Sequence, residues 1–198
     1  MDHGGESALA ARFALSLPAV AAPGATAGVE VGTEKMFREA VDRGDPALFV
    51  VTMLDKEHAS FERTYQHIKT RLTSKVIPVE IPIGEGAKFR GVINLFARKA
   101  YLYKQGTKSG EYEEQDIPAD EQGRFDHYYQ ELIEAISATD DTMLEHYLEG
   151  AEIGRDEAIQ GMKEAMKRMD LFPLFCVSAD SMIGVRALLT EIAQVIRR

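Results

Sequence analysis

Tryptophan is absent from the 198 residues, and Cys176 is the single cysteine. One thiol cannot form an intramolecular disulfide, so the chain lies outside the disulfide-dense secreted proteins. Cys176 lies within the apolar stretch LFPLFCVSA. We therefore expect a buried, unreactive thiol and not a nucleophile. The five histidines have no cysteine or third ligand at metal-binding spacing, so the sequence predicts no metal site.

Long hydrophobic runs are missing as well. No stretch is long and apolar enough to span a bilayer, so no membrane segment is expected. Residues 8–22, ALAARFALSLPAVAA, have the apolar core of a signal peptide. However, Asp2 and Glu6 stand where a positive start is expected, and Arg12 interrupts the core. We therefore favour a cytoplasmic location.

Positive charge is scarce in the second half of the chain. The formal net charge is −9. Residues 1–100 carry 13 Lys and Arg against 12 Asp and Glu, whereas residues 101–198 carry 10 against 20. Broad binding to a phosphate backbone is excluded there, so DNA is not an expected partner. The acidic half suits a basic protein partner or a solvated helical surface.

The stretch 47–55, ALFVVTMLD, organises the rest of the chain. Such a short apolar run is typical of a strand buried on both faces, and therefore of a parallel sheet covered by helices. A helix is predicted before it, capped by Thr33 and ended by Gly44, with an inner stripe of Met36, Phe37, Ala40 and Val41. Ligands of such sheets bind beyond the carboxyl ends of the strands, here at residues 53–56.

The remaining chain predicts a second unit and a return to the first. Residues 76–83, VIPVEIPI, read as one outer strand, because Pro78 and Pro82 remove N–H groups from the same edge. Apolar periodicity and turn residues predict an edge strand within 13–20, a helix at 60–72, antiparallel strands within 89–117 and helices at 121–137 and 155–170. Between these last two, a helix is recapped by Thr139-Asp140-Asp141 and closed by Gly150. A second buried strand at 171–179 and a closing helix at 185–197 follow.

Two distant stretches carry a resemblance to a known family. They are GVEVGTEKMFREAVDRGDPALFVVTMLDKE and, near the end, CVSADSMIGVRALL. The first resembles the approach to the guanine-binding loop of elongation factor G, a translational GTPase. The second resembles its last nucleotide-contacting loop. The resemblance implies that Asp55 accepts hydrogen bonds from guanine and that Ser178 and Ala179 contact the base oxygen. It also implies GTP or GDP with Mg²⁺ as cofactor.

The chain departs from the family pattern where activity depends on it. The family has N-K-x-D, but this chain has Thr52-Met53-Leu54-Asp55. Residues 1–9, MDHGGESAL, resemble a phosphate-binding loop without its lysine, and a frayed terminus rich in small residues explains them better. Residues 21–24, AAPG, lack the Asp of D-x-P-G, and most of the switch segments are missing. We therefore expect impaired nucleotide binding and no hydrolysis, and the sequence leaves open whether the chain is an enzyme.

The predicted fold class is α/β: an abridged Ras-like parallel sheet with helices on both faces, plus an inserted α+β subdomain. Residues 1–56 and 170–198 form the abridged GTPase-like domain, and residues 57–169 form the insertion. The predicted function is that of an elongation factor G-like GTP-binding translation factor or a fragment of one. The alternative is a non-catalytic module that binds the ribosome or its stalk protein through the acidic insertion. An incomplete gene product without independent function is a third hypothesis.

Overall fold

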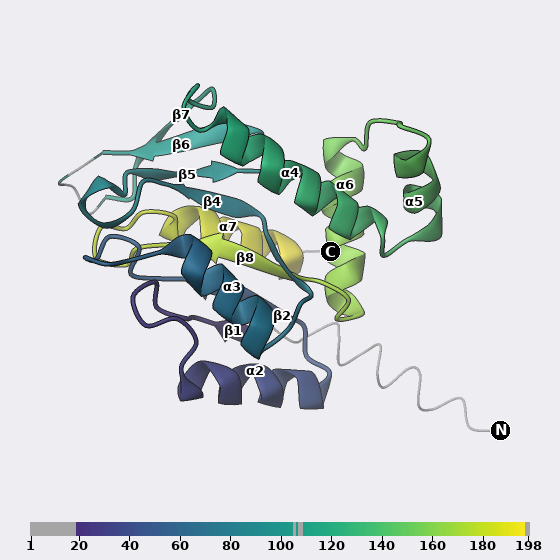
Figure 1. The fold of residues 1–198 in the computed structure, drawn as a ribbon, viewed down its shortest axis with the longest axis horizontal. Helices are drawn as coiled ribbons and strands as arrows, with labels where there is room; N and C mark the ends of the chain where they lie inside the picture. Colours follow the sequence, from purple (N-terminus) through teal and green to yellow (C-terminus); the bar gives the residue numbers. More distant parts are fainter. Residues whose placement is uncertain (1–18, 105, 107–108, 197–198) are drawn as a thin grey trace.

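The computed structural model describes residues 19–104, 106 and 109–196 (Figure 1). The phosphate-loop-like segment 1–9 and most of the signal-like segment 8–22 lie outside these residues. Within the described part of the chain, every helix is too short or too polar to cross a bilayer.

A four-stranded parallel sheet forms the first half of the architecture. Its strands are β1 (Ala19–Ala21), β2 (Ala47–Val51), β3 (Val76–Pro78) and β8 (Phe172–Cys176), in the order β1-β2-β8-β3. The two central strands are buried at every residue, as apolar runs flanked by helices require. Val50 lies beside Phe175 in the register of β2 and β8. Both predicted buried strands are therefore confirmed, and so is the α/β fold class.

Three helices connect or follow these strands: α2 (Val31–Arg43), α3 (Phe61–Arg71) and α7 (Val185–Ile196). The predicted end of α2 is confirmed, because Gly44 takes the left-handed conformation (φ 69°) that closes a helix. The predicted start is wrong. Thr33 lies inside the helix, and Glu30 is the N-cap residue without a side-chain hydrogen bond.

The predicted inner stripe of α2 is correct in part. Phe37 and Ala40 are buried, and the Phe37 ring lies 5.0 Å from that of Phe49 and 5.1 Å from that of Phe172. Met36 and Val41 are exposed instead. The helix packs beside β1, an edge strand of only three residues, so it buries a narrower stripe than the sequence pattern offers.

The single outer strand predicted at 76–83 is wrong. The chain forms β3 in the parallel sheet and then β4 (Glu80–Ile83) in a second sheet, with Val79 between them. The Val79 N–H donates to the Leu174 carbonyl, and its carbonyl accepts from Leu95, both at 3.0 Å. Each of the two strands lies at a sheet edge, so the outer position expected from the prolines holds for both.

The second sheet is antiparallel, with the order β4-β5-β6-β7, and three helices follow it. The predicted antiparallel unit is thus confirmed. The division of the chain at residues 57–169 remains a prediction, although β3 within that range hydrogen-bonds to β8 in the parallel sheet. The other elements are η1 (Gly86–Lys88), β5 (Gly91–Asn94), β6 (Lys99–Tyr103), β7 (Tyr112–Gln115), α4 (Gln122–Ser137), α5 (Asp141–Leu148) and α6 (Arg155–Lys167).

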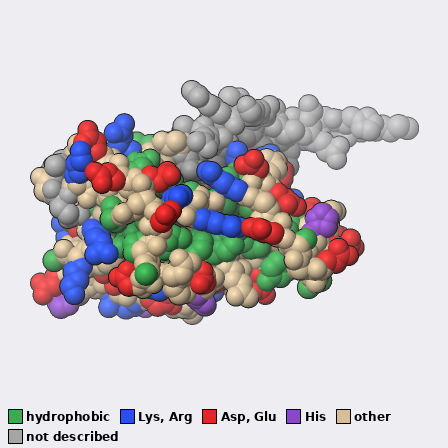
Figure 2. All heavy atoms as spheres, turned by 90° about the horizontal axis from the view of Figure 1, so that it is seen from above, with side chains coloured by type: hydrophobic (Ala, Val, Ile, Leu, Met, Phe, Trp, Pro, Cys, Tyr) green, Lys and Arg blue, Asp and Glu red, His purple; other side chains and the backbone are tan. Residues whose placement is uncertain are grey.

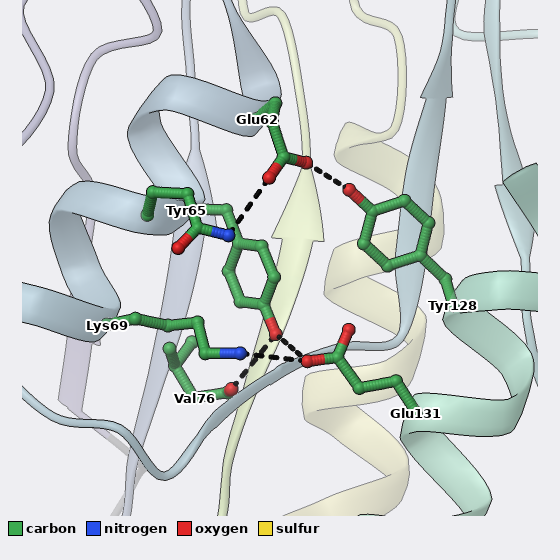
Figure 3. A network of polar contacts seen from close by, with 7 residues as sticks. Glu62, Tyr65, Lys69, Val76, Tyr128 and Glu131 are labelled. Carbon is green, nitrogen blue, oxygen red and sulfur yellow. Dashed lines mark hydrogen bonds and ion pairs between the residues drawn. The ribbon is translucent and has the colours of Figure 1, made fainter.

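A polar network joins α3 to α4 (Figure 3). Tyr65 donates its hydroxyl hydrogen to Glu131 at 2.8 Å, and the Lys69 ammonium donates to the same carboxylate oxygen at 2.9 Å. Tyr128 donates in the reverse direction, from α4 to Glu62 on α3. We call these five residues the tyrosine network. It holds a helix that follows the antiparallel sheet against a helix that covers the parallel one.

The tyrosine network favours the protonated phenols. Burial raises the pKa of Tyr65 and of Tyr128 above the ordinary value of 10.0, and the hydrogen bonds to Glu131 and Glu62 raise them further. A group whose pKa is higher in the folded state stabilises the fold fully below its unfolded pKa. That contribution is lost as the pH rises above 10.

We predict that Tyr128→Phe lowers the free energy of unfolding by about 0.5–1.5 kcal/mol at pH 8, because a half-buried hydrogen bond is lost while water still reaches the exposed Glu62 carboxylate. The difference from the unmodified protein should shrink as the pH rises above about 10, since the unmodified protein then loses the same contribution. Urea denaturation at a series of pH values measures both effects.

Tyr112→Phe is the matched control, because Tyr112 is exposed and its hydroxyl has no hydrogen bond within the described part of the chain. It should leave the stability unchanged at every pH. A constant difference between Tyr128→Phe and the unmodified protein across the alkaline range would contradict the prediction.

Candidate functional site

The candidate site lies at the carboxyl edge of the parallel sheet. There, β2 runs into residues 52–56 and β8 runs into residues 177–180. The Val177 N–H donates to the Val51 carbonyl at 2.9 Å, so the two loops begin side by side. The structure therefore brings Asp55 to the same edge as Ser178 and Ala179, as their strand positions predict. Their contact with a nucleotide remains a prediction.

The backbone holds the Asp55 loop in place. Thr52 donates its N–H to Pro23 at 3.1 Å and accepts from the Ala25 N–H at 2.8 Å, which ties the loop to the segment after β1. Met53 has a φ of 61°, and its carbonyl accepts from the Lys56 N–H at 3.1 Å to close a tight turn. Asp55 thereby stands at the rim of the sheet with its side chain 21% exposed.

The Ser178 loop is a second tight turn. Ser178 is fully buried, and its N–H donates to the Ile183 carbonyl at 2.9 Å. Its hydroxyl accepts from the Ser181 N–H at 3.3 Å. Because these contacts are internal, the Ser178 side chain shapes the loop, and Ala179 and Asp180 are exposed at its tip.

A lysine that sequence reasoning missed connects the two loops. The Lys56 ammonium donates to Asp180 and lies 3.2 Å from Asp55. The hydrogen bond to Asp180 and then the one to Asp55 raise the pKa of Lys56 above its ordinary 10.5, so it stays charged at neutral pH. The sequence contains a clue to this ion pair: a lysine follows Asp55 directly, and an aspartate follows Ala179 directly.

This ion pair changes what Asp55 can do. A carboxylate that binds guanine must offer its oxygens to ring N–H groups. Here one Asp55 oxygen already faces an ammonium from its own loop. A base that enters the site must compete with Lys56 for the Asp55 carboxylate. The ion pair therefore favours the state in which Asp55 is bound to Lys56 and not to a ligand.

An arginine on α3 fixes the surrounding loops, and no sequence pattern pointed to it. The Arg63 guanidinium donates to the carbonyls of Ala25 and Thr26, each at 3.2 Å, and to the carbonyl of His58 at 2.9 Å. It thus joins the loop after β1 to the chain that follows Asp55. Hydrogen bonds within the protein therefore hold the loops at this edge in place without a ligand.

The segment 1–9, which resembles a phosphate-binding loop, lies outside the described part of the chain. Within the residues that are described, no group of three or more His, Cys, Asp and Glu side chains could hold a metal ion. Asp55, Ser178 and Ala179 are the groups at this edge to which the resemblance gives a role.

Comparison with known proteins supports the fold. The chain is similar to a protein from Thermus thermophilus whose crystal structure is known, with a TM-score of 0.81 and 34% sequence identity. The match covers 94% of this chain and 27% of that protein, so the chain spans about a quarter of its homologue's length. No protein-family model matches the chain. The chain is therefore an α/β protein with a homologue of established structure.

We predict that Gly184→Ala destroys the Ser178 loop. Gly184 has a φ of 75°, and a Cβ there would lie 2.1 Å from the Cys176 carbonyl oxygen. Backbone cannot yield as a flexible side chain does, so the free energy of unfolding should fall by more than about 2 kcal/mol. Thermal or urea denaturation checks the value.

Gly123→Ala is the matched control. Gly123 lies in α4, and nothing lies within 4 Å of its Cβ position. The same methyl group should raise the stability there by about 0.5–1 kcal/mol. Equal effects of the two substitutions would show that Gly184 is under no constraint.

Proposed function

We propose that the chain is an elongation factor G-like translation factor, or part of one, that binds GDP or GTP weakly and does not hydrolyse it. The observation that carries the proposal is the convergence of the Asp55 and Ser178 loops at one sheet edge, closed by Lys56. The first loop keeps the family's carboxylate without its Asn and Lys. Both the resemblance and the ion pair thus support a weakened base site.

The magnitudes agree with weak binding. Charge-assisted hydrogen bonds from guanine to Asp55 contribute about 1.5–3 kcal/mol. A micromolar complex needs about 8 kcal/mol and a millimolar one about 4 kcal/mol. Breaking the Lys56–Asp55 ion pair reduces the free energy of binding only slightly, because solvent screens an exposed pair. Base contacts at this edge therefore reach the millimolar range at best.

We predict a millimolar Kd for GDP with Mg²⁺ in an isothermal titration. Lys56→Gln should tighten binding about two- to fivefold, because it frees Asp55 at the expense of an exposed ion pair. Thr52→Asn together with Met53→Lys restores the family motif and should tighten binding about tenfold. Met53 already has a positive φ and is half exposed, so a lysine adds no backbone strain there.

Two variants make this titration decisive. Asp55→Asn should abolish the response, because the acceptor for the guanine N–H groups is lost. Lys99→Gln is the control: it breaks an exposed ion pair between Lys99 on β6 and Asp116, which directly follows β7, and should change nothing. Micromolar binding by the unmodified protein, or an unchanged affinity in Asp55→Asn, would overturn the proposal.

A second candidate function is docking to the ribosomal stalk protein through the acidic insertion. Residues 121–170 carry 13 Asp and Glu against 5 Lys and Arg. Figure 2 shows acidic side chains gathered at the end of the molecule where α5 lies. Leu148 on α5 is 74% exposed, and Glu145 and Glu149 lie close to it in the sequence. An exposed leucine on an acidic helix suits a basic partner that has an apolar anchor point.

We predict that Leu148→Ser weakens capture of the stalk protein in a pull-down at least about fivefold, because the apolar anchor is removed. Val31→Ser is the control, since Val31 is as exposed as Leu148 but lies on α2, which packs against the parallel sheet. Equal capture by all three proteins would exclude α5 as the docking site, and no capture by any of them would exclude this function.

A further inference from the structure

An apolar groove crosses the face of the parallel sheet away from the Asp55 edge. Its floor includes Leu48 and Pro173, which lie near the beginnings of β2 and β8, whereas Asp55 follows the end of β2. The walls come from α6 and α7 and from the end of β5. The lining residues are Leu48, Val79, Asn94, Phe96, Ile159, Met162, Lys163, Met166, Pro173, Phe175 and Ile192.

The two polar members of this lining are both hydrogen-bond donors. The Asn94 side-chain oxygen accepts from the Ala97 N–H at 2.9 Å, so the amide nitrogen is the end left for other contacts. That nitrogen has no acceptor within the described part of the chain. Lys163 is half-buried on α6, and its ammonium forms no ion pair with any described residue.

Lys163 differs in this respect from the next lysine of the same helix. Lys167 is exposed and pairs with Glu164 at 2.8 Å. A half-buried ammonium and an amide donor over an apolar floor complement a ligand with an apolar body and an anionic acceptor. A carboxylate fits both donors, because its two oxygens accept several hydrogen bonds.

The size of the groove limits the apolar body. Its volume is about 40 Å³. A space of ~10–15 Å³ holds one water-sized sphere, so the groove accepts a body of roughly three or four heavy atoms. Met162 and Met166 form part of the wall, and methionine side chains adapt to branched shapes.

We propose that this groove binds small branched aliphatic carboxylates, with the carboxylate held by Lys163 and Asn94 and the alkyl group lying between α6 and the sheet. The site is independent of the nucleotide edge and of the function proposed for it. It lies on a face of the sheet and uses no residue of the Asp55 or Ser178 loops.

The test is a titration of the whole chain with isovalerate, followed by NMR of ¹³C-methyl methionine. The Met162 and Met166 signals should shift with a millimolar Kd. Met36 and Met53 are exposed elsewhere and should not move. Isovaleramide, which has the same shape without the charge, should bind about tenfold more weakly. Equal shifts with both compounds would show a merely apolar hollow and overturn the proposal.

Variants of α6 separate the carboxylate contact from general effects. Lys163→Met keeps the apolar stem and should weaken isovalerate binding about tenfold, whereas Lys163→Arg should retain it. Lys167→Met should have no effect. An unchanged melting temperature of each ligand-free variant verifies that it is folded. No shift of Met162 or Met166 at saturating isovalerate refutes the site. Shifts that follow protein concentration instead would identify a second copy of the chain as the occupant and refute it as well.

Discussion

The pairing of β2 with β8 is the constraint on which the rest of the molecule depends. These strands are separated by 120 residues along the chain, yet Phe49, Val50 and Val51 lie in register with Leu174, Phe175 and Cys176. Every side chain of both strands is buried, so a slip of one residue would displace both faces of the core at once. The register also decides which residues leave the sheet together. Because Val51 pairs with Cys176, the Asp55 and Ser178 loops begin at the same level.

Much of this framework was predictable because it rests on burial. An apolar run bounded by turn residues can satisfy its backbone and side chains together only inside a sheet, and both central strands were found on that basis. Helix ends set by local chemistry were predictable too. Asp140 caps α5 by accepting from the Met143 N–H at 3.0 Å, and Gly44 ends α2.

What the sequence could not supply depends on contacts between distant segments. The crossing from β3 to β4 occurs at Val79, whose two backbone hydrogen bonds go to Leu174 and Leu95. No local pattern records that change, because alternating apolar residues suit one long strand as well as two short ones. The exposure of Met36 and Val41 likewise follows from the narrow sheet edge beside α2. At the site, Lys56 and Asp180 are 124 positions apart, so their places directly after Asp55 and Ala179 indicate an ion pair only once the two loops are known to meet.

The antiparallel sheet also stabilises the Ser178 loop, because its first strand contacts the end of β8. Glu80, the first residue of β4, is fully buried, and its carboxylate accepts from the Cys176 N–H at 3.4 Å. The Glu80 carbonyl accepts from the Cys176 thiol, whose pKa is raised by burial, so the sulfur stays protonated and serves as a donor. Tyr103 of β6 is buried next to the backbone of Gly184, which follows the same loop. Burying the Glu80 carboxylate costs free energy unless it is hydrogen-bonded, so its contacts fix its position. The candidate edge therefore depends on both sheets, because Glu80 of the antiparallel sheet contacts Cys176, two residues before Ser178.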